Sequence, residues 1–175
     1  MIYEAEEELA VVNEKDEVIG SATREKIWRE GLRHRIVRVM LRNSEGQFLL
    51  QKRSSRMSLY PNCWDQSASG HVDAGEEYEA AAYRELKEEV GIEGITLKEI
   101  GYYEEHGTYE WRKLNRFHRV YEGLIQDLPE KLQAEEVVDV QWFSLHQVRQ
   151  LIEEQPENLS DGLKEIFARF YYEEA

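Results

Sequence analysis

Residues Gly70–Ile92 read GHVDAGEEYEAAAYRELKEEVGI, and this stretch decides how the rest of the chain is interpreted. The run from Glu77 to Val90 is rich in Ala, Glu, Leu and Lys, which favour helix, and a glycine follows it, as at many helix ends. We therefore predict a helix that begins near Glu77 and ends before Gly91. Gly70, which has no side chain, lets the backbone turn closely ahead of this helix.

Three acidic side chains share one face of the predicted helix. Glu85, Glu88 and Glu89 are spaced i, i+3 and i+4, which makes them neighbours on a helical surface. Carboxylates this close repel one another unless a positive charge lies among them, and a hard dication such as Mg²⁺ or Mn²⁺ prefers oxygen ligands. Glu76, in the glycine-flanked loop before the helix, can add a further oxygen. The residues of the adjoining face, which are expected to pack inward, are Ala82, Leu86 and Val90.

This block resembles the Nudix box of the Nudix hydrolase family. A glutamate-rich helix alone is usually a solvated surface, but here nine positions of the family's pattern occur together at its spacing. They are Gly70, Glu76, Arg84, Glu85, Leu86, Glu88, Glu89, Gly91 and Ile92. The box is specific for the fold, whereas it indicates almost nothing about the substrate.

The resemblance implies a fold, an activity and a set of site residues. The fold is an α/β/α sandwich with a mixed β-sheet. The activity is metal-dependent hydrolysis of a diphosphate linkage in a nucleoside di- or triphosphate or a nucleoside diphosphate derivative, with Mg²⁺ or Mn²⁺ as cofactor. Arg84 would brace the acidic residues by ion pairing, and Glu85, Arg84 and Glu88 would form the catalytic set. The residues implied at the metal are Gly70, Glu76, Glu85, Glu88 and Glu89.

Length and charge limit the remaining function classes. The 175 residues, 41% of them hydrophobic, suit a single domain with a sizeable core. The net charge of −14 argues against non-specific binding to nucleic acid or to anionic membranes. The partner we expect is therefore a phosphorylated small molecule such as a nucleotide, bound by a monomer or a homodimer.

The sequence also bears on location. No run approaches the roughly 18 apolar residues that a membrane span needs. The acidic start of the chain, MIYEAEEELAVV, lacks the basic segment that precedes the apolar part of a signal peptide. The single cysteine, Cys63, excludes an internal disulfide and suits a reducing compartment. We expect a cytoplasmic protein, in which Cys63 is a small buried apolar residue rather than a nucleophile.

Apolar periodicity and turn residues divide the rest of the chain into short elements. Residues 1–33 are expected to form a hairpin and a short helix capped by Thr23, and residues 34–175 the core with its C-terminal helices. Strands are expected over 9–13, 17–22, 34–42, 47–53, 64–72, 96–104, 114–126 and 137–143, with 34–53 forming a hairpin. Further helices are expected over 25–30, 144–154 and 160–172, and residues 106–113 are expected to form a mobile loop.

A second, weaker resemblance covers most of the chain. The stretches VNEKDEV (12–18) and LRHR (32–35) are similar to a Nudix subgroup that carries an N-terminal hairpin and includes isopentenyl diphosphate isomerase. The isomerase uses a Cys before a Gly-His pair and a later Glu-x-Glu, whereas this chain has Ser69 before Gly70 and His71, and no Glu-x-Glu near residues 115–117. Because a serine hydroxyl is a much weaker acid than a thiol, hydrolysis is favoured. Isomerase-like activity and a non-catalytic nucleotide-binding regulator are the alternatives.

Several roles stay open at this level. The general base is Glu85 itself or a glutamate from a later loop, either the pair Glu135 and Glu136 or the pair 104–105. Lys52, Arg53 and Arg56 are candidates to hold a second phosphate, although basic residues at strand ends are usually only solvated. His34 and His71 are candidates for substrate or for a second metal. The aromatic residues considered for stacking on a base are Trp64, Tyr102, Tyr103, Trp111 and Phe117.

Overall fold

We describe residues 7–175 of a computed structural model of the chain; residues 1–6 lie outside this description, and with them part of the N-terminus in which we expect no signal peptide. The strands are β1 (Glu8–Val12), β2 (Val18–Thr23), β3 (His34–Arg42), β4 (Phe48–Arg53), β5 (Trp64–Asp65), β6 (Ala68–His71), β7 (Lys98–Tyr109), β8 (Arg112–Leu124) and β9 (Val137–Phe143). The helices are α1 (Arg24–Glu30), α2 (Tyr78–Val90), α3 (Leu145–Glu154), α4 (Asp161–Phe170) and the 3₁₀ helix η1 (Pro156–Asn158). No helix of the described residues is long and apolar enough to cross a membrane.

Strand β3 organises the sheet. On one edge it pairs in parallel with β8 along its whole length, from His34 opposite Arg116 to Arg42 opposite Leu124. Its other edge is shared by three antiparallel neighbours, β1, β6 and β4. The N-terminal hairpin of β1 and β2 extends the sheet at β1, while β5 and β9 pair with β4. The sheet is therefore mixed, as predicted from the sequence.

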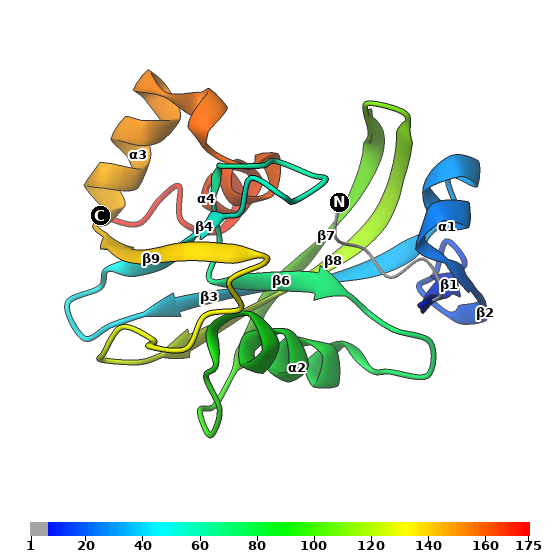
Figure 1. Cartoon of the computed structure of the whole chain (residues 1–175), viewed down its shortest axis with the longest axis horizontal. Coiled ribbons are helices and arrows are strands. Elements are labelled where there is room, and N and C mark those ends of the chain that lie inside the picture. Colours follow the sequence, from blue (N-terminus) through cyan, green and yellow to red (C-terminus); the bar gives the residue numbers. More distant parts are fainter. Residues whose placement is uncertain (1–6) are drawn as a thin grey trace.

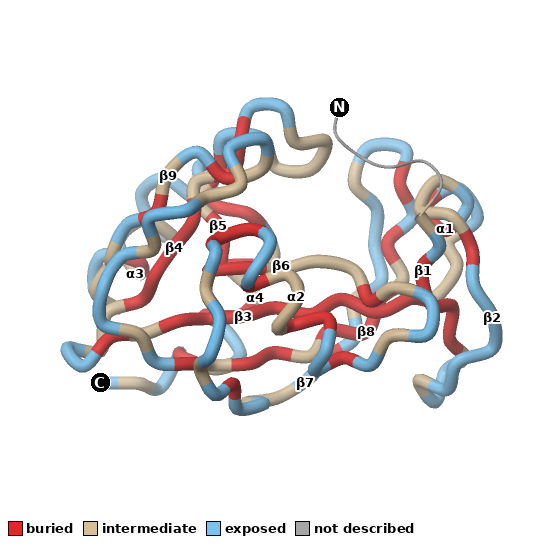
Figure 2. The backbone as a smooth tube through the Cα atoms, turned by 60° about the horizontal axis from the view of Figure 1, so that its bottom comes forward, coloured by how far each residue is buried: buried red, intermediate tan, exposed pale blue. Residues whose placement is uncertain are grey.

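Helices cover both faces of the sheet, with α2 on one face and α3 and α4 on the other (Figure 1). The arrangement follows from β3, because successive side chains of a strand point to opposite faces. Val39 joins one core with Leu86 of α2, whereas Met40 joins a second core with Leu163 of α4. Buried positions run along β3 and β8 between these two layers (Figure 2). The predicted α/β/α sandwich is confirmed, and the three apolar α2 residues expected to pack inward are fully buried.

Local capping interactions set the helix ends where the sequence places them. The Thr23 hydroxyl accepts a hydrogen bond from the Lys26 N–H at 3.4 Å at the start of α1. At α3, Ser144 and Gln147 bond each other's backbone N–H in a capping box. Gly91 ends α2 with φ of 67°, a left-handed conformation that glycine adopts without steric cost.

The predicted strand over 64–72 is wrong in its continuity, because two short strands, β5 and β6, replace it. Strand β5 pairs with β4, whereas β6 pairs with β3, and Ser67 between them is bonded to both β3 and β4. Its hydroxyl donates to the Leu49 carbonyl at 2.6 Å and accepts from the Leu41 N–H at 2.8 Å. For the same reason the predicted 34–53 hairpin pairs only near its turn, at Leu41–Leu49 and Arg42–Phe48, before β6 takes over the edge of β3.

The predicted mobile loop over 106–113 is also wrong. Strand β7 continues to Tyr109 and β8 begins at Arg112, so a tight turn joins two long paired strands. The Arg112 guanidinium lies 4.9 Å from the ring centroids of both Trp28 and Trp111, and this arginine is only 2% exposed. Cation–π contacts with a residue of α1, which is distant in sequence, therefore hold the hairpin tip in place.

Candidate active site

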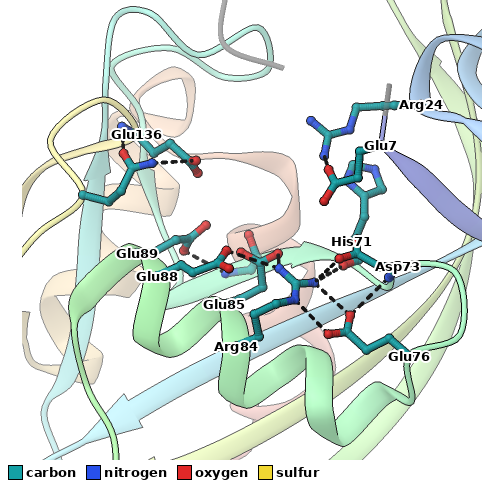
Figure 3. Close-up of polar contacts among 12 residues, drawn as sticks. Glu7, Arg24, His71, Asp73, Glu76, Arg84, Glu85, Glu88, Glu89 and Glu136 are labelled. Atoms are coloured by element: carbon teal, nitrogen blue, oxygen red, sulfur yellow. Dashed lines mark hydrogen bonds and ion pairs between the residues drawn. The ribbon is translucent and has the colours of Figure 1, made fainter. Parts of the chain in front are cut away.

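A cavity of about 480 Å³ lies between α2, β6 and the loop that joins β4 to β5. Acidic side chains of α2 line one side, and the first turn of α4 also reaches it. Figure 3 shows Glu85, Glu88 and Glu89 pointing from the helix into this region, with Glu136 and the Glu7–Arg24 ion pair at other sides of it. The acidic face predicted from the helical spacing thus opens onto this cavity.

Arg84 lies at the centre of the acidic cluster. Its guanidinium bonds both carboxylate oxygens of Glu76, at 2.8 and 2.9 Å, and reaches Glu85 at 2.7 Å and Glu88 at 3.3 Å. It also donates to the His71 carbonyl at 2.9 Å, which ties α2 to β6. The bonds from Glu76 hold the pKa of Arg84 above its usual range, so the guanidinium stays charged. Arg84 therefore forms ion pairs with three of the glutamates of this cluster.

Glu85 approaches β6 where Gly70 leaves room for it. A Cβ atom at position 70 would lie 2.1 Å from Oε1 of Glu85, so any larger residue would collide with this carboxylate. Burial raises the pKa of Glu85 to about 8, although Arg84 opposes the shift. A bound cation would offset the free-energy cost of burying the ionised carboxylate.

Glu89 is more deeply buried and is held by neutral donors. Its Oε2 accepts from the Gln51 side-chain amide at 2.7 Å and from the Ser69 N–H at 3.1 Å. Burial raises the pKa of Glu89 well above its usual value, and the nearby charges of Glu85 and Glu136 raise it further. A positive charge between Glu85 and Glu89 would therefore stabilise the ionised forms of both side chains.

Among the glutamates considered as general base, Glu136 has the most suitable surroundings. It lines the cavity, its pKa is raised by burial, and the Gln133 side chain donates to its Oε1 at 3.2 Å. Glu135 also lines the cavity, but its side chain is 60% exposed and lies 4.0 Å from Arg56. Glu105 lies outside this lining, and Arg116 and His118 engage its carboxylate, each at 2.7 Å.

The structure separates the residues proposed for substrate binding. Arg53 and His71 line the cavity, whereas Lys52, Arg56 and His34 do not. The Lys52 ammonium lies over the Trp64 ring, 5.2 Å from its centroid, and the Arg56 side chain is 64% exposed. His34 is fully buried behind His71, and their rings stack with centroids 5.4 Å apart.

None of the five aromatic residues considered for base stacking lines the cavity. Tyr103 and Phe117 are buried, while Tyr102 and Trp111 are exposed elsewhere. The cavity instead receives side chains that no local sequence pattern indicates, and they come from segments distant from the box in sequence. They are Arg24, Trp28, Arg38, Tyr60, Asp65 and Arg116.

His34→Gln is expected to make the free energy of unfolding less sensitive to acid. Burial lowers the pKa of His34 from 6.5 to about 3, so the unfolded chain takes up this proton first as the pH falls. The stability present above the unfolded pKa is therefore lost as the pH falls from 6.5 toward 3. Between about pH 7.5 and pH 5.5 the unmodified protein should lose about 1.4 kcal/mol relative to the variant.

Urea unfolding at the two pH values measures this difference. His146→Gln, which changes an exposed histidine of α3, is the matched control. An equal pH response of the His34 variant and the unmodified protein would contradict the assignment of His34 as a neutral, buried group.

The donor set fits a divalent ion in its chemistry. Within residues 7–175, no three acidic, imidazole or thiol side chains already converge on one point. The Arg84 guanidinium instead lies among Glu76, Glu85 and Glu88 and supplies positive charge there. Carboxylate oxygens are the ligands that Mg²⁺ and Mn²⁺ prefer, and a cation would favour the ionised forms of Glu85 and Glu89.

Comparisons with known proteins decide the family. The model of the NUDIX domain matches residues 32–170 of the chain. The protein belongs to the Nudix family. It is similar to the uncharacterised Nudix hydrolase PA4841 of Pseudomonas aeruginosa, with 35% identity over 137 residues that cover 77% of each chain. This Nudix protein is therefore a hydrolase, as its sequence predicts.

Solved structures agree with this assignment. The crystal structure of DR0079 from Deinococcus radiodurans has a TM-score of 0.80 and 31% identity to this Nudix hydrolase, covering 94% of this chain and 99% of that one. The Nudix domain of NrtR from Shewanella oneidensis, solved in complex with ADP ribose, has a TM-score of 0.61. Its identity is 18%, over 78% of this chain and 84% of that one, so this second likeness concerns the fold alone.

Proposed function

We propose that this Nudix hydrolase cleaves a diphosphate linkage in a nucleoside di- or triphosphate, or in a nucleoside diphosphate derivative, and that it requires Mg²⁺ or Mn²⁺. The observation that carries the proposal is the acidic face of α2, braced by Arg84, opening onto a cavity whose other walls contain arginines. Carboxylates without metal would repel a diphosphate, whereas the same carboxylates with metal attract it. The arginines suit the remaining phosphate oxygens.

The chain's own residues divide the work. Glu85, Glu88 and Glu89 would hold the metal, with Glu76 and the backbone at Gly70 completing the site. A bound divalent ion supplies charge that neutralises the diphosphate and makes a water molecule more acidic. Arg84 orients the carboxylates through the four ion pairs that it makes, including one with Asp73 at 3.5 Å.

Glu136 is the proton acceptor that we propose. Water attacks phosphorus, the bridging P–O bond breaks, and the carboxylate of Glu136 takes the proton that the water loses. Its raised pKa, caused by burial, brings it closer to the working pH of such a base. Glu85 is the other candidate, and the rate–pH profile of Glu136→Gln distinguishes the two. If Glu136 is the base, this variant should lose the slope of the acidic limb. If Glu85 is the base, the variant should keep that slope.

The alternatives receive less support. Cys63 does not line the cavity, and its Sγ lies 3.5 Å from the Glu157 carbonyl, so no thiol is placed beside Gly70 for isomerase chemistry. A purely regulatory protein would bind a nucleotide without cleaving it. Analysing by mass spectrometry the products formed in H₂¹⁸O from a panel of nucleotides, ADP-ribose among them, and from isopentenyl diphosphate tests all three functions. Only hydrolysis places solvent oxygen on a product phosphate group, isomerisation leaves the diphosphate intact, and a regulator leaves every compound unchanged.

Activity is expected to be absent without Mg²⁺ or Mn²⁺. Calorimetric titration of the purified protein should show divalent ion binding that weakens by about tenfold or more in Glu88→Gln and in Glu89→Gln, because each removes an anionic oxygen donor. Full hydrolysis in excess chelator would contradict the metal requirement. Ion binding that is unchanged in both variants would place the metal elsewhere.

A further inference from the structure

Arg38 is a buried cation that the chemistry of α2 does not use. It lies on β3, is 7% exposed, and lines the same cavity as Glu85. Its Nε donates to Nδ1 of His118 at 3.0 Å and its Nη1 donates to the Gln66 side-chain oxygen at 3.1 Å. Both partners are neutral groups, since burial lowers the pKa of His118 well below its usual value. Within residues 7–175, Nη2 of Arg38 has no hydrogen-bond partner.

The acidic residues around Arg38 are already paired with other cations. Asp65 is bonded by Arg53 at 3.0 Å, Glu105 by Arg116 at 2.7 Å, and Asp161 by Lys164 at 2.9 Å. No carboxylate of the described residues lies within 4.0 Å of the Arg38 guanidinium. The hydroxyl groups nearby, those of Tyr60 and Tyr103, are uncharged, because burial raises the pKa of each. Arg38 therefore has no carboxylate paired directly with it among these neighbours.

The first turn of α4 is built against the same guanidinium. A Cβ atom at Gly162 would lie 2.2 Å from Nη1 and 2.7 Å from Nη2 of Arg38, so only glycine admits this contact. Ser160 caps the helix by accepting from the Leu163 N–H at 3.1 Å. Within the described part of the chain, no acceptor takes the N–H of Asp161 or Gly162. Free N–H groups at a helix N-terminus attract anions, and here a buried arginine lies beside them.

We propose that Arg38 and the N-terminal turn of α4 form a binding site for a substrate phosphate that is not one of the two phosphates of the cleaved linkage. This inference rests on the proposed function, since it assigns a substrate class to the same cavity. An arginine with free N–H groups, beside unpaired backbone amides, matches the several oxygens of a phosphate group. The preferred substrates then carry an additional phosphate, as nucleoside triphosphates and 2′-phosphorylated dinucleotides do.

Binding without metal tests the site directly. In excess chelator, calorimetric titration with inorganic phosphate should give millimolar binding that weakens by about tenfold or more in Arg38→Gln, because charge-assisted hydrogen bonds are lost. Arg29→Gln, which removes an exposed arginine of α1 paired only with Glu25, is the matched control and should bind as the unmodified protein does. No phosphate binding by the unmodified protein, or equal binding by Arg38→Gln, overturns the proposal.

Two substrate pairs test the role in selectivity. ATP differs from ADP, and NADP⁺ from NAD⁺, by one phosphate. Arg38→Gln should lower kcat/KM for the phosphate-bearing member by about tenfold or more, mainly through KM, and for its partner by less than about threefold. Gly162→Ala keeps the arginine but displaces it, so it should give the same selective loss, and Arg38→Lys should restore part of it. Equal losses for both members of each pair overturn the assignment.

The two arms separate this inference from the proposed function. If the protein hydrolyses no member of the nucleotide panel but loses phosphate binding in Arg38→Gln, the anion site stands and the proposed hydrolysis fails. If hydrolysis is metal-dependent but Arg38→Gln and Gly162→Ala change neither phosphate binding nor the selectivity within the two substrate pairs, the proposed function stands and the anion site fails. Circular dichroism of each variant shows whether it is folded, and Gly162→Ala provides the test if Arg38→Gln is not.

Discussion

Glu85→Gln is expected to lower kcat/KM for the best diphosphate substrate by about 10²-fold or more, the usual weight of a group that holds a metal or moves a proton. The amide keeps the size of the side chain and can still accept the hydrogen bond from Arg84, but it has no charge to offer a cation. Steady-state assays at saturating Mg²⁺ measure the loss. Raising the metal concentration should not restore the rate if the charge itself is needed.

The same variant should be as stable as the unmodified protein or more stable, although it is less active. Burial makes the charge of Glu85 costly in the metal-free protein, so an uncharged amide should leave the free energy of unfolding equal or higher. Glu79→Gln changes an exposed glutamate on the same helix and should leave both activity and stability near those of the unmodified protein. Full activity of Glu85→Gln would show that the reaction does not need the charge of Glu85.

Local patterns in the sequence predict the acidic face of α2 because they depend on residues close together in the chain. The i, i+3, i+4 spacing places three carboxylates together, and Gly91 ends the helix as expected. The caps at Thr23 and Ser144 are equally local. The resemblance to a known box then supplies the fold, which the comparisons confirm.

The opposite wall of the cavity could not be predicted in this way. Arg38 reaches it because β3 pairs with β6 and β8, and its contact with Gly162 joins residues far apart in the sequence. The turn at 110–111 is not predictable from the sequence for a similar reason, since it is held by the contact of Arg112 with Trp28 of α1. Such tertiary contacts leave no periodic signal within a short window.

Gly70→Ala is expected to lower kcat/KM by about 10²-fold while the protein stays folded. The reason is that the added methyl group displaces the Glu85 carboxylate from its place in the site. The added Cβ would lie 2.1 Å from Oε1 and 2.2 Å from Cδ of Glu85, so the carboxylate must leave its place between β6 and Arg84. The backbone of Gly70 is not in the left-handed region, so alanine fits its conformation without strain. Assays of hydrolysis and of thermal unfolding on one preparation separate the two effects.

Gly107→Ala is the matched control for this substitution. Gly107 also lies in a strand, its backbone is not in the left-handed region, and a Cβ there meets nothing within 4 Å. The same chemical change should therefore leave both activity and unfolding temperature nearly unaltered. If Gly70→Ala loses stability and activity in parallel, the glycine serves packing between α2 and β6. If it retains full activity, the position of the Glu85 carboxylate against β6 does not matter for the reaction, and the metal must be held by Glu88 and Glu89 without it.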